Sequence, residues 1–311
     1  MTRRDALLAL ASVLAGCNRA RGSRPRVAFV LKTFNSPFFL DMRRGAEAAA
    51  TRAGIDLIVQ AAEREIDVER QMQIIENLIE TRVAVLCLCP SGSKEIVPAV
   101  GKANRAGIPV IIVDDELDES AAAQQGVSFD TYIGSDNVEG GRIAGQYLVD
   151  ASGKSARLAL LEGTPGHQTG DARLRGFLDA IRSAPGVAVV SSQTANWERD
   201  QGFTVFRNML QAHPEIDALF ACNDMMALGA LEAIQAAGRT GRIRVIGFDA
   251  VDDARKAIAT GRMEASVAQY PEEMGRIAIE SAVKRIRGEP VPRDQRTKVG
   301  LVTRANVDAP R

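Results

Sequence analysis

The stretch Arg26-Val-Ala-Phe-Val-Leu-Lys-Thr-Phe-Asn-Ser-Pro-Phe-Phe39 decides the fold of this chain. Its first part is an apolar run typical of a buried strand, and Pro37 suits the first turn of a helix. The same change from strand pattern to helix pattern recurs at intervals of about thirty residues, the size of a βαβ unit. Such alternation predicts an α/β fold with a parallel, doubly wound sheet that helices cover on both faces.

The length of the chain indicates two lobes rather than one. About ten strand–helix repeats in 311 residues are too many for one open sheet. We therefore expect two Rossmann-like lobes, each with a sheet of about five to six strands. A natural break lies near Ser135-Asp136, and an edge-like strand at residues 299–303 ends the pattern.

Polar or aromatic side chains follow seven of the predicted strands. Ligands of parallel α/β sheets bind outside the carboxyl ends of the strands, where these side chains should converge. Carboxylate, amide and guanidinium groups can form paired hydrogen bonds with adjacent hydroxyls, and an aromatic ring can stack on the C–H face of a sugar. We therefore predict one cleft for a neutral, polyhydroxylated ligand. The candidate binding residues are Lys32, Asn35, Ser36, Phe38, Phe39, Asp114, Asp115, Arg173, Trp197, Asn223, Asp249 and Gln269.

Asn35 and Ser36, the polar pair in the opening stretch, could have a purely structural role. Asn35 or Ser36 can cap the helix that Pro37 begins. The adjacent Phe38 and Phe39 point in different directions on a helix, so we expect at least one of them to face the cleft.

Two later candidates depend on their surroundings. Trp197 is the only tryptophan and lies in a polar turn, where it either stacks on a sugar ring or remains an isolated surface residue. Asp224 is the expected cap of a helix that starts at Met225, which would leave the Asn223 side chain for a ligand.

Composition and motifs argue against several classes of function. Basic and acidic side chains number 39 each, so nothing suggests a nucleic-acid surface. His167 and His213 share no metal-ligand spacing with each other or with a cysteine. No nucleotide, hydrolase or metalloprotease motif occurs, and we expect no cofactor, no metal and no catalysis. The adjacent pair Asp114-Asp115 leaves glycoside hydrolysis as a remote alternative, although adjacent residues rarely flank one bond.

The N-terminus is expected to be a processing segment. The basic pair Arg3-Arg4 and a short apolar run precede Leu14-Ala-Gly-Cys17, which resembles a bacterial lipobox. We expect residues 1–17 to be a lipoprotein signal peptide, Cys17 to carry the lipid, and residues 18–25 to be a linker. The protein would then lie in the periplasm or at the cell surface, anchored to a membrane. A short amphipathic helix in a cytoplasmic protein is the alternative.

The remaining cysteines, Cys87, Cys89 and Cys222, are expected to be buried apolar side chains rather than disulfide partners.

Several motifs together resemble one family. They are Lys32-Thr-Phe-Asn-Ser-Pro-Phe-Phe39, Val113-Asp-Asp-Glu116, Gly170-Asp-Ala-Arg173, Ala195-Asn-Trp197, Ala221-Cys-Asn-Asp224, Gly247-Phe-Asp249 and Val267-Ala-Gln269. On these residues the chain is similar to the ribose-type (type I) periplasmic sugar-binding proteins of ABC importers, and most of all to their allose-binding branch. The resemblance covers the chain from Arg26 to about Thr303.

The resemblance implies two discontinuous lobes joined by three hinge crossings, near Ser135, Gln269 and Thr297. The first lobe would comprise residues 26–135 and 270–296, and the second residues 136–269 and 297–311. A monosaccharide would bind between the lobes, and the closed, monomeric protein would dock on an ABC permease. The implied sugar contacts are Lys32, Phe39, Asp114, Asp115, Arg173, Trp197, Asn223, Asp249 and Gln269.

Two positions depart from the family pattern. Asp115 replaces a Glu of the allose type and an Arg of the ribose type, and Ser36 stands where both types usually carry Asn. These departures leave the identity of the sugar open. A sensory lipoprotein that signals to a receptor kinase or chemoreceptor is the alternative function. A repressor of the lactose type would need a DNA-binding domain of about sixty residues before the first strand, which the resemblance places at Arg26.

Overall fold

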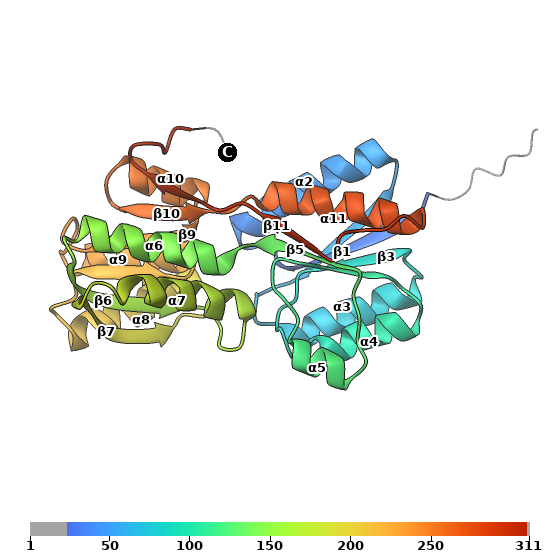
Figure 1. Ribbon diagram of the computed structural model, residues 1–311, viewed down its shortest axis with the longest axis horizontal. Coiled ribbons are helices and arrows are strands. Elements are labelled where there is room, and N and C mark those ends of the chain that lie inside the picture. Colours follow the sequence, from blue (N-terminus) through green and yellow to red (C-terminus); the bar gives the residue numbers. More distant parts are fainter. Residues whose placement is uncertain (1–23, 310–311) are drawn as a thin grey trace, which may run out of the picture.

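The computed structural model of the protein describes residues 24–309. It contains two lobes, each built on a six-stranded sheet (Figure 1). The predicted signal peptide, the predicted lipidation of Cys17 and most of the predicted linker lie outside the described residues. No described helix is both long and apolar enough to cross a membrane.

The sheet of the first lobe has the order β11-β5-β4-β3-β1-β2, and every neighbouring pair is parallel. Its strands are β1 (Arg26–Thr33), β2 (Asp56–Ala62), β3 (Val85–Leu88), β4 (Val110–Val113), β5 (Thr131–Ser135) and β11 (Asp294–Thr297). Its helices are α2 (Pro37–Ala53), α3 (Val68–Glu80), α4 (Val97–Arg105), α5 (Glu119–Gln124) and α11 (Pro271–Ile286). One apolar core lies between the sheet and the pair α2 and α11, and a second lies under α3, α4 and α5.

The sheet of the second lobe has the order β12-β10-β9-β8-β6-β7. Its strands are β6 (Ser155–Glu162), β7 (Gly186–Thr194), β8 (Ala218–Ala221), β9 (Arg244–Asp249), β10 (Ala265–Ala268) and β12 (Gly300–Thr303). Its helices are α6 (Asn137–Ala151), α7 (Gln168–Ile181), α8 (Arg199–Ala212), α9 (Asp224–Ala236) and α10 (Asp252–Ala259). The sequence predicts parallel sheets, and β12 is the exception because it runs antiparallel to β10. A short connection from β11 delivers β12 to this edge from the other lobe.

The chain passes between the two sheets after β5, after β10 and after β11. These connections leave the carboxyl ends of the strands of both sheets at the interface between the lobes (Figure 1). The residues that bound each lobe remain a prediction.

Two helix pairs approach each other closely through glycine. A Cβ atom at Gly45 of α2 would overlap the carbonyl oxygen of Glu272 in α11, and one at Gly275 would overlap that of Met42. In the second lobe, a Cβ atom at Gly141 of α6 would overlap the carbonyl oxygen of Arg173 in α7. Glycine is therefore required where helices that carry site residues pack together.

Most local predictions of structure agree with the fold. Ser36 occupies the predicted cap position of α2, although its side chain makes no capping hydrogen bond. Cys87, Cys89 and Cys222 are free and buried.

Candidate ligand-binding site

A small cavity lies between the lobes at the carboxyl ends of the strands. Its volume is only about 20 Å³, so the side chains of the two lobes approach one another closely around it. The lining side chains come from both lobes. They are Lys32, Ser36, Phe38, Phe39, Glu65, Asp114, Thr169, Arg173, Trp197, Asn223, Asp249 and Gln269. The structure therefore brings together all the predicted binding residues except Asn35 and Asp115.

Backbone strain marks three of these positions. Asp114 has a φ of 70°, Trp197 of 67° and Asp249 of 112°. Non-glycine residues rarely adopt positive φ, and such strain concentrates at functional sites. At the ends of β4 and β9 it turns the chain sharply, so that the Asp114 and Asp249 side chains line the cavity.

The guanidinium group of Arg173 is held in place by neighbours of its own lobe. Its Nε donates to Asn137 Oδ1 at 2.8 Å, and its Nη1 donates to the carbonyl oxygen of Cys222 at 2.7 Å. Its plane lies over the Phe248 ring, with the guanidinium carbon 4.0 Å from the ring centre. A third neighbour, Asp249 Oδ1, is 3.8 Å from Nη1. Arg173 is therefore a fixed donor at the cavity wall.

Asp249 and Gln269 form a second fixed pair. Gln269 Nε2 donates to Asp249 Oδ1 at 2.7 Å. Burial raises the pKa of Asp249 to about 7, against the opposing effect of Arg173. Gln269 Oε1 is buried and has no hydrogen-bond partner among the described residues. Because buried polar atoms are nearly always satisfied, this oxygen is positioned to accept a hydrogen bond from a ligand.

The first lobe contributes a cluster of buried charges. Lys32 Nζ lies 3.1 Å from Asp115 Oδ2 and 3.7 Å from Asp114 Oδ2. Burial opposes the charge of Lys32, but Asp115, Asp114 and Glu65 together raise its pKa above the usual value. Burial also raises the pKa of Asp114, and raises that of Glu65 to about 8. Glu65 is thus available as a hydrogen-bond donor at neutral pH.

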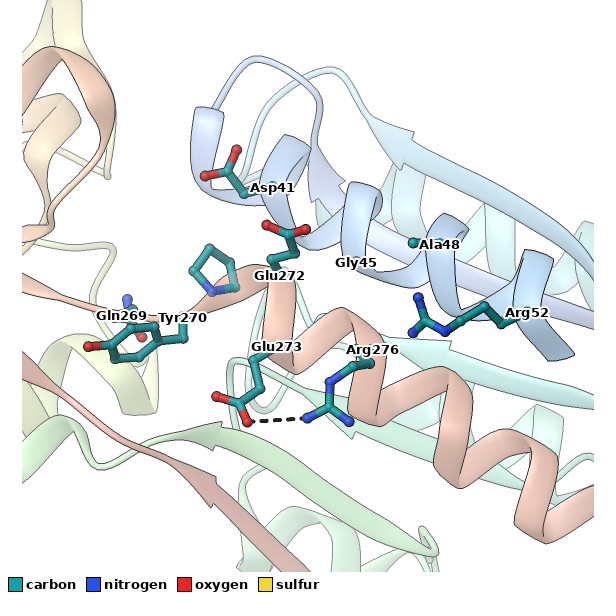
Figure 2. A pocket seen from close by; sticks show the side chains of 10 residues that line it. Asp41, Gly45, Ala48, Arg52, Gln269, Tyr270, Glu272, Glu273 and Arg276 are labelled. Carbon is teal, nitrogen blue, oxygen red and sulfur yellow. Dashed lines mark hydrogen bonds and ion pairs between the residues drawn. The ribbon is translucent and has the colours of Figure 1, made fainter. Parts of the chain in front are cut away.

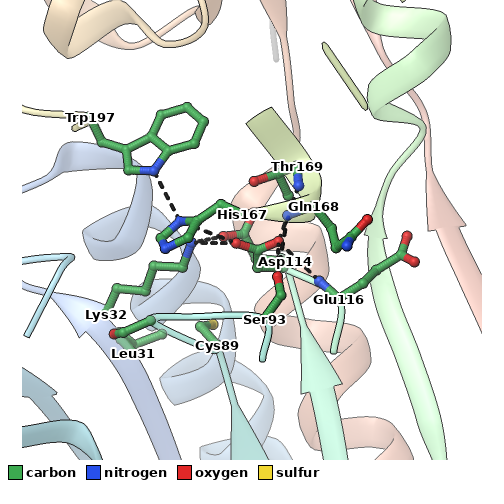
Figure 3. Close-up of polar contacts among 12 residues, drawn as sticks. Leu31, Lys32, Cys89, Ser93, Asp114, Glu116, His167, Gln168, Thr169 and Trp197 are labelled. Carbon is green, nitrogen blue, oxygen red and sulfur yellow. Dashed lines mark hydrogen bonds and ion pairs between the residues drawn. The ribbon is translucent and has the colours of Figure 1, made fainter. Parts of the chain in front are cut away.

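Aromatic rings form the remaining walls. Phe38 and Phe39 both line the cavity and meet edge to face, with ring centres 5.2 Å apart. Trp197 is buried, and its Nε1 donates to His167 Nδ1 at 3.1 Å (Figure 3). Burial and the nearby Lys32 lower the pKa of His167 to about 4, so its imidazole is neutral and can accept this bond.

Three predictions about individual side chains need correction. Asn35 is exposed and its Nδ2 donates to the carbonyl oxygen of Glu63 at 2.8 Å, so it holds a loop instead of lining the cavity. Asp115 is fully buried behind the cavity wall. Asn223, not Asp224, caps α9, because its extended backbone at the end of β8 lets Oδ1 accept from Met226 N at 2.9 Å.

The capping role does not remove Asn223 from the cavity wall. Its Nδ2 donates to the carbonyl oxygen of Trp197 at 3.1 Å, which ties the strained turn of Trp197 to α9. Asp224 is instead buried, where it accepts hydrogen bonds from Ser266 Oγ and Val251 N.

Sequence reasoning missed Glu65, Thr169 and His167. Glu65 follows β2, so the rule that ligands bind beyond strand ends would have found it. Thr169 lies in the first turn of α7, and His167 was considered only as a metal ligand. Within residues 24–309, no group of three or more His, Cys, Asp or Glu side chains is placed to hold a metal ion.

A second and larger cavity, of about 370 Å³, lies beside the crossing between β10 and α11 (Figure 2). Gln269 lines this cavity as well as the first one. Several of its charged side chains pair along their own helices, as Arg276 does with Glu273 at 3.2 Å. Strand ends do not converge on it, so the smaller cavity is the better candidate despite its size.

Comparison with known proteins agrees with this geometry. Residues 27–290 match the family model described as the periplasmic binding protein domain. The chain belongs to the periplasmic binding protein family. Members of this family bind substrates and are not enzymes, which agrees with the prediction that no catalysis occurs, and they work outside the cytoplasm.

Individual members of the family resemble the chain over most of its length. The ribose import binding protein RbsB of Bacillus subtilis is 39% identical over 265 residues, covering 85% of this chain and 83% of the relative. The D-allose-binding periplasmic protein of Escherichia coli is 32% identical over 277 residues, covering 88% and 89%. An ABC transporter periplasmic solute-binding protein from Actinobacillus succinogenes, solved with bound D-allose, superposes with a TM-score of 0.85 at 37% identity, covering 91% of this chain and 99% of that one.

Proposed function

We propose that this protein binds one monosaccharide of the ribose or allose type between its lobes and delivers it to an ABC permease. Gln269 Oε1 carries the proposal, because this buried acceptor lacks a partner among the described residues and belongs to a residue that lines the cavity. Around it stand the fixed donor Arg173, the carboxyl groups of Asp114 and Asp249, and the Trp197 ring. A polyhydroxylated ring matches this set of donors, acceptors and apolar faces.

Calorimetry against a panel of aldopentoses and aldohexoses tests the proposal. D-allose and D-ribose are expected to bind, because relatives of the chain are named for these sugars. Bound sugar should also raise the melting temperature through mass action. A panel in which no aldose binds would reject the sugar assignment.

The mechanism that we propose is closure of the two lobes on the sugar. The connections after β5, after β10 and after β11 would act as the hinge, near Ser135, Gln269 and Thr297. A sugar that bonds to both lobes stabilises the closed state over the open state, which shifts the population toward closure. Small-angle scattering should show a smaller radius with sugar than without it. An unchanged radius at saturating sugar would reject closure.

Attachment to a membrane is the last part of the proposal. The motif Leu14-Ala-Gly-Cys17 supports lipidation of Cys17 after cleavage of the preceding residues. Wild-type protein should then fractionate with membranes, whereas Cys17→Ser should be released or remain unprocessed. Wild-type protein that retains Met1 and fractionates with the cytoplasm would contradict this assignment.

A further inference from the structure

The Asp115 carboxylate has a full set of partners inside the protein. Its Oδ1 accepts from Glu116 N at 3.1 Å, from Thr169 N at 3.1 Å and from Ser93 Oγ at 3.4 Å. Its Oδ2 accepts from Lys32 Nζ at 3.1 Å. Asp115 is also fully buried and does not line the cavity, so in this closed arrangement its carboxylate bonds to protein groups and not to a sugar hydroxyl.

Two of the contacts around Asp115 join the two lobes directly. Thr169 N belongs to α7 of the second lobe, whereas Asp115 follows β4 of the first. Beside this bond, Gln168 N donates across the same interface to Ser93 Oγ at 3.2 Å (Figure 3). The first amide groups of a helix have no acceptor inside the helix, and a carboxylate near them is favoured by the helix dipole. These amides therefore gain partners only when the lobes meet.

His167 extends the same contact. It precedes α7 in the second lobe, and it makes a hydrogen bond with the backbone of Ser91 in the first lobe. Its Nδ1 lies 3.5 Å from Asp115 Oδ2. The ring thus lies between the Trp197 wall of the cavity and the Asp115 carboxylate.

We propose that Ser93 and Asp115 of the first lobe and the amides of Gln168 and Thr169 of the second form an interlobe latch. Ser93, Asp115 and Gln168 do not line the cavity, so their contacts stabilise the closed state without bonding to the sugar. Asp115 is accordingly a positioning residue rather than a sugar ligand. The latch raises the closed fraction of the unliganded protein and slows release of every sugar by one common factor. The effect on sugar release rests on the proposed sugar-binding function, whereas the effect on the closed fraction of the unliganded protein does not.

Ser93 and Ser91 provide a matched pair of variants for the test. Both are fully buried in the same loop after β3, but only the Ser93 hydroxyl bonds across the interface. Ser91 Oγ has no hydrogen-bond partner in the part of the chain that the structure describes. Ser93→Ala therefore removes a latch contact, and Ser91→Ala removes a similar hydroxyl without one.

Because the chain has a single tryptophan, 5-fluorotryptophan at Trp197 gives a fluorine NMR probe of the lobe interface. Relaxation dispersion and line intensities give the closed-to-open ratio without sugar. We expect Ser93→Ala to lower this ratio by about three- to tenfold, the effect of one net hydrogen bond, while Ser91→Ala matches the wild type. Equal ratios in all three proteins, or equal losses in both variants, would overturn the latch.

Sugar release provides the second readout. Stopped-flow fluorescence should show faster release of every bound sugar from Ser93→Ala by the same factor, with the order of preference among sugars unchanged. Asp115→Asn is unsuited to this readout, because it would also remove the charged partner of Lys32 in the cavity wall. If Ser93→Ala instead alters the affinity for one sugar relative to another, the Ser93 side chain contacts the sugar and the latch assignment is wrong.

The two proposals fail separately. If no sugar changes the Trp197 resonance, the sugar-binding proposal fails. The comparison of Ser93→Ala with Ser91→Ala in unliganded protein still decides whether the latch exists.

Discussion

Asp114 and Asp115 are neighbours in the chain, yet they face two regions of the lobe interface that differ in how complete their hydrogen bonding is. Asp114 lines the cavity, where Gln269 Oε1 has no partner among the described residues. Asp115 lies in the latch, where protein groups occupy its carboxylate. Both carboxylates lie near Lys32 Nζ, at 3.7 Å for Asp114 and 3.1 Å for Asp115, but only Asp114 lines the cavity. In the cavity a buried acceptor is left for a ligand to bond, whereas in the latch the bonds form between protein groups of the two lobes.

The largest effect should come from removing the fixed donor of the cavity. Arg173→Ala removes a charged donor from the cavity wall, and a hydrogen bond to a charged group contributes about 1.5–3 kcal/mol. We expect a loss of sugar affinity of about ten- to a hundredfold by calorimetry. Arg175→Ala is the control, because this exposed arginine lies on the same helix outside the cavity. Equal affinities of the two variants would remove Arg173 from the site.

The next effect concerns the aromatic wall. Trp197→Ala should weaken sugar binding by roughly 1–3 kcal/mol, because stacking and apolar burial are both lost. Wild-type fluorescence should change on titration with sugar, and Trp197 is the only possible indole source. Because Trp197 also packs in the core of its lobe, the melting temperature of the variant must be measured beside its affinity. Normal affinity in a folded variant would place the indole outside the sugar contact.

A pH titration separates the latch from the cavity. Closure holds the pKa of His167 near 4, whereas an open, hydrated histidine should titrate near its usual value of 6.5. The open state therefore binds more protons between these values, so falling pH should weaken sugar binding through His167. The groups facing His167 include Lys32, Asp115 and Glu95. We expect the affinity of the wild type, relative to His167→Asn, to fall about twentyfold from pH 7 to pH 5.

The cavity acids contribute with the opposite sign. Glu65 and Asp249 have raised pKa values of about 8 and about 7, so closure favours their protonated forms and acid strengthens it. This contribution is present in both proteins and cancels in the comparison with His167→Asn. If the sugar affinity of the wild type divided by that of His167→Asn stays constant across the pH range, His167 does not change its environment on closure.

The smallest effect should come from Asn35. Its side chain bonds the carbonyl oxygen of Glu63 at the surface, so Asn35→Ala should change sugar affinity by no more than about twofold. Calorimetry should compare the sugar affinities of Asn35→Ala and Ser36→Ala, because Ser36 lines the cavity and Asn35 does not. A larger loss for Asn35→Ala than for Ser36→Ala would return Asn35 to the binding surface.

The sequence was sufficient to predict the two-lobe α/β fold and most of the cavity wall, because both depend on one rule. Strand ends in parallel sheets meet at a common edge, so Asp114, Asn223 and Asp249 could be placed together from their positions after apolar runs. Asp115 and Asn35 do not line the cavity, because a position after a strand does not show which side chains bond to protein groups instead, as Asn35 does to the carbonyl oxygen of Glu63. His167 was missed because its partners, Trp197 and Asp115, are brought near it only by the folded lobes.

The close packing of α2 against α11 has a mechanical consequence. Phe38 and Phe39 begin α2, and Gln269 stands just before α11, so both helices carry parts of the cavity wall at their first turns. The contacts at Gly45 and Gly275 leave no room for even a methyl group between them. We therefore expect the two helices to move as one unit when the lobes close, so that Phe38 and Phe39 keep their position relative to Gln269. An added methyl group in Gly275→Ala would push the helices apart and should weaken sugar binding, although it lies away from the cavity.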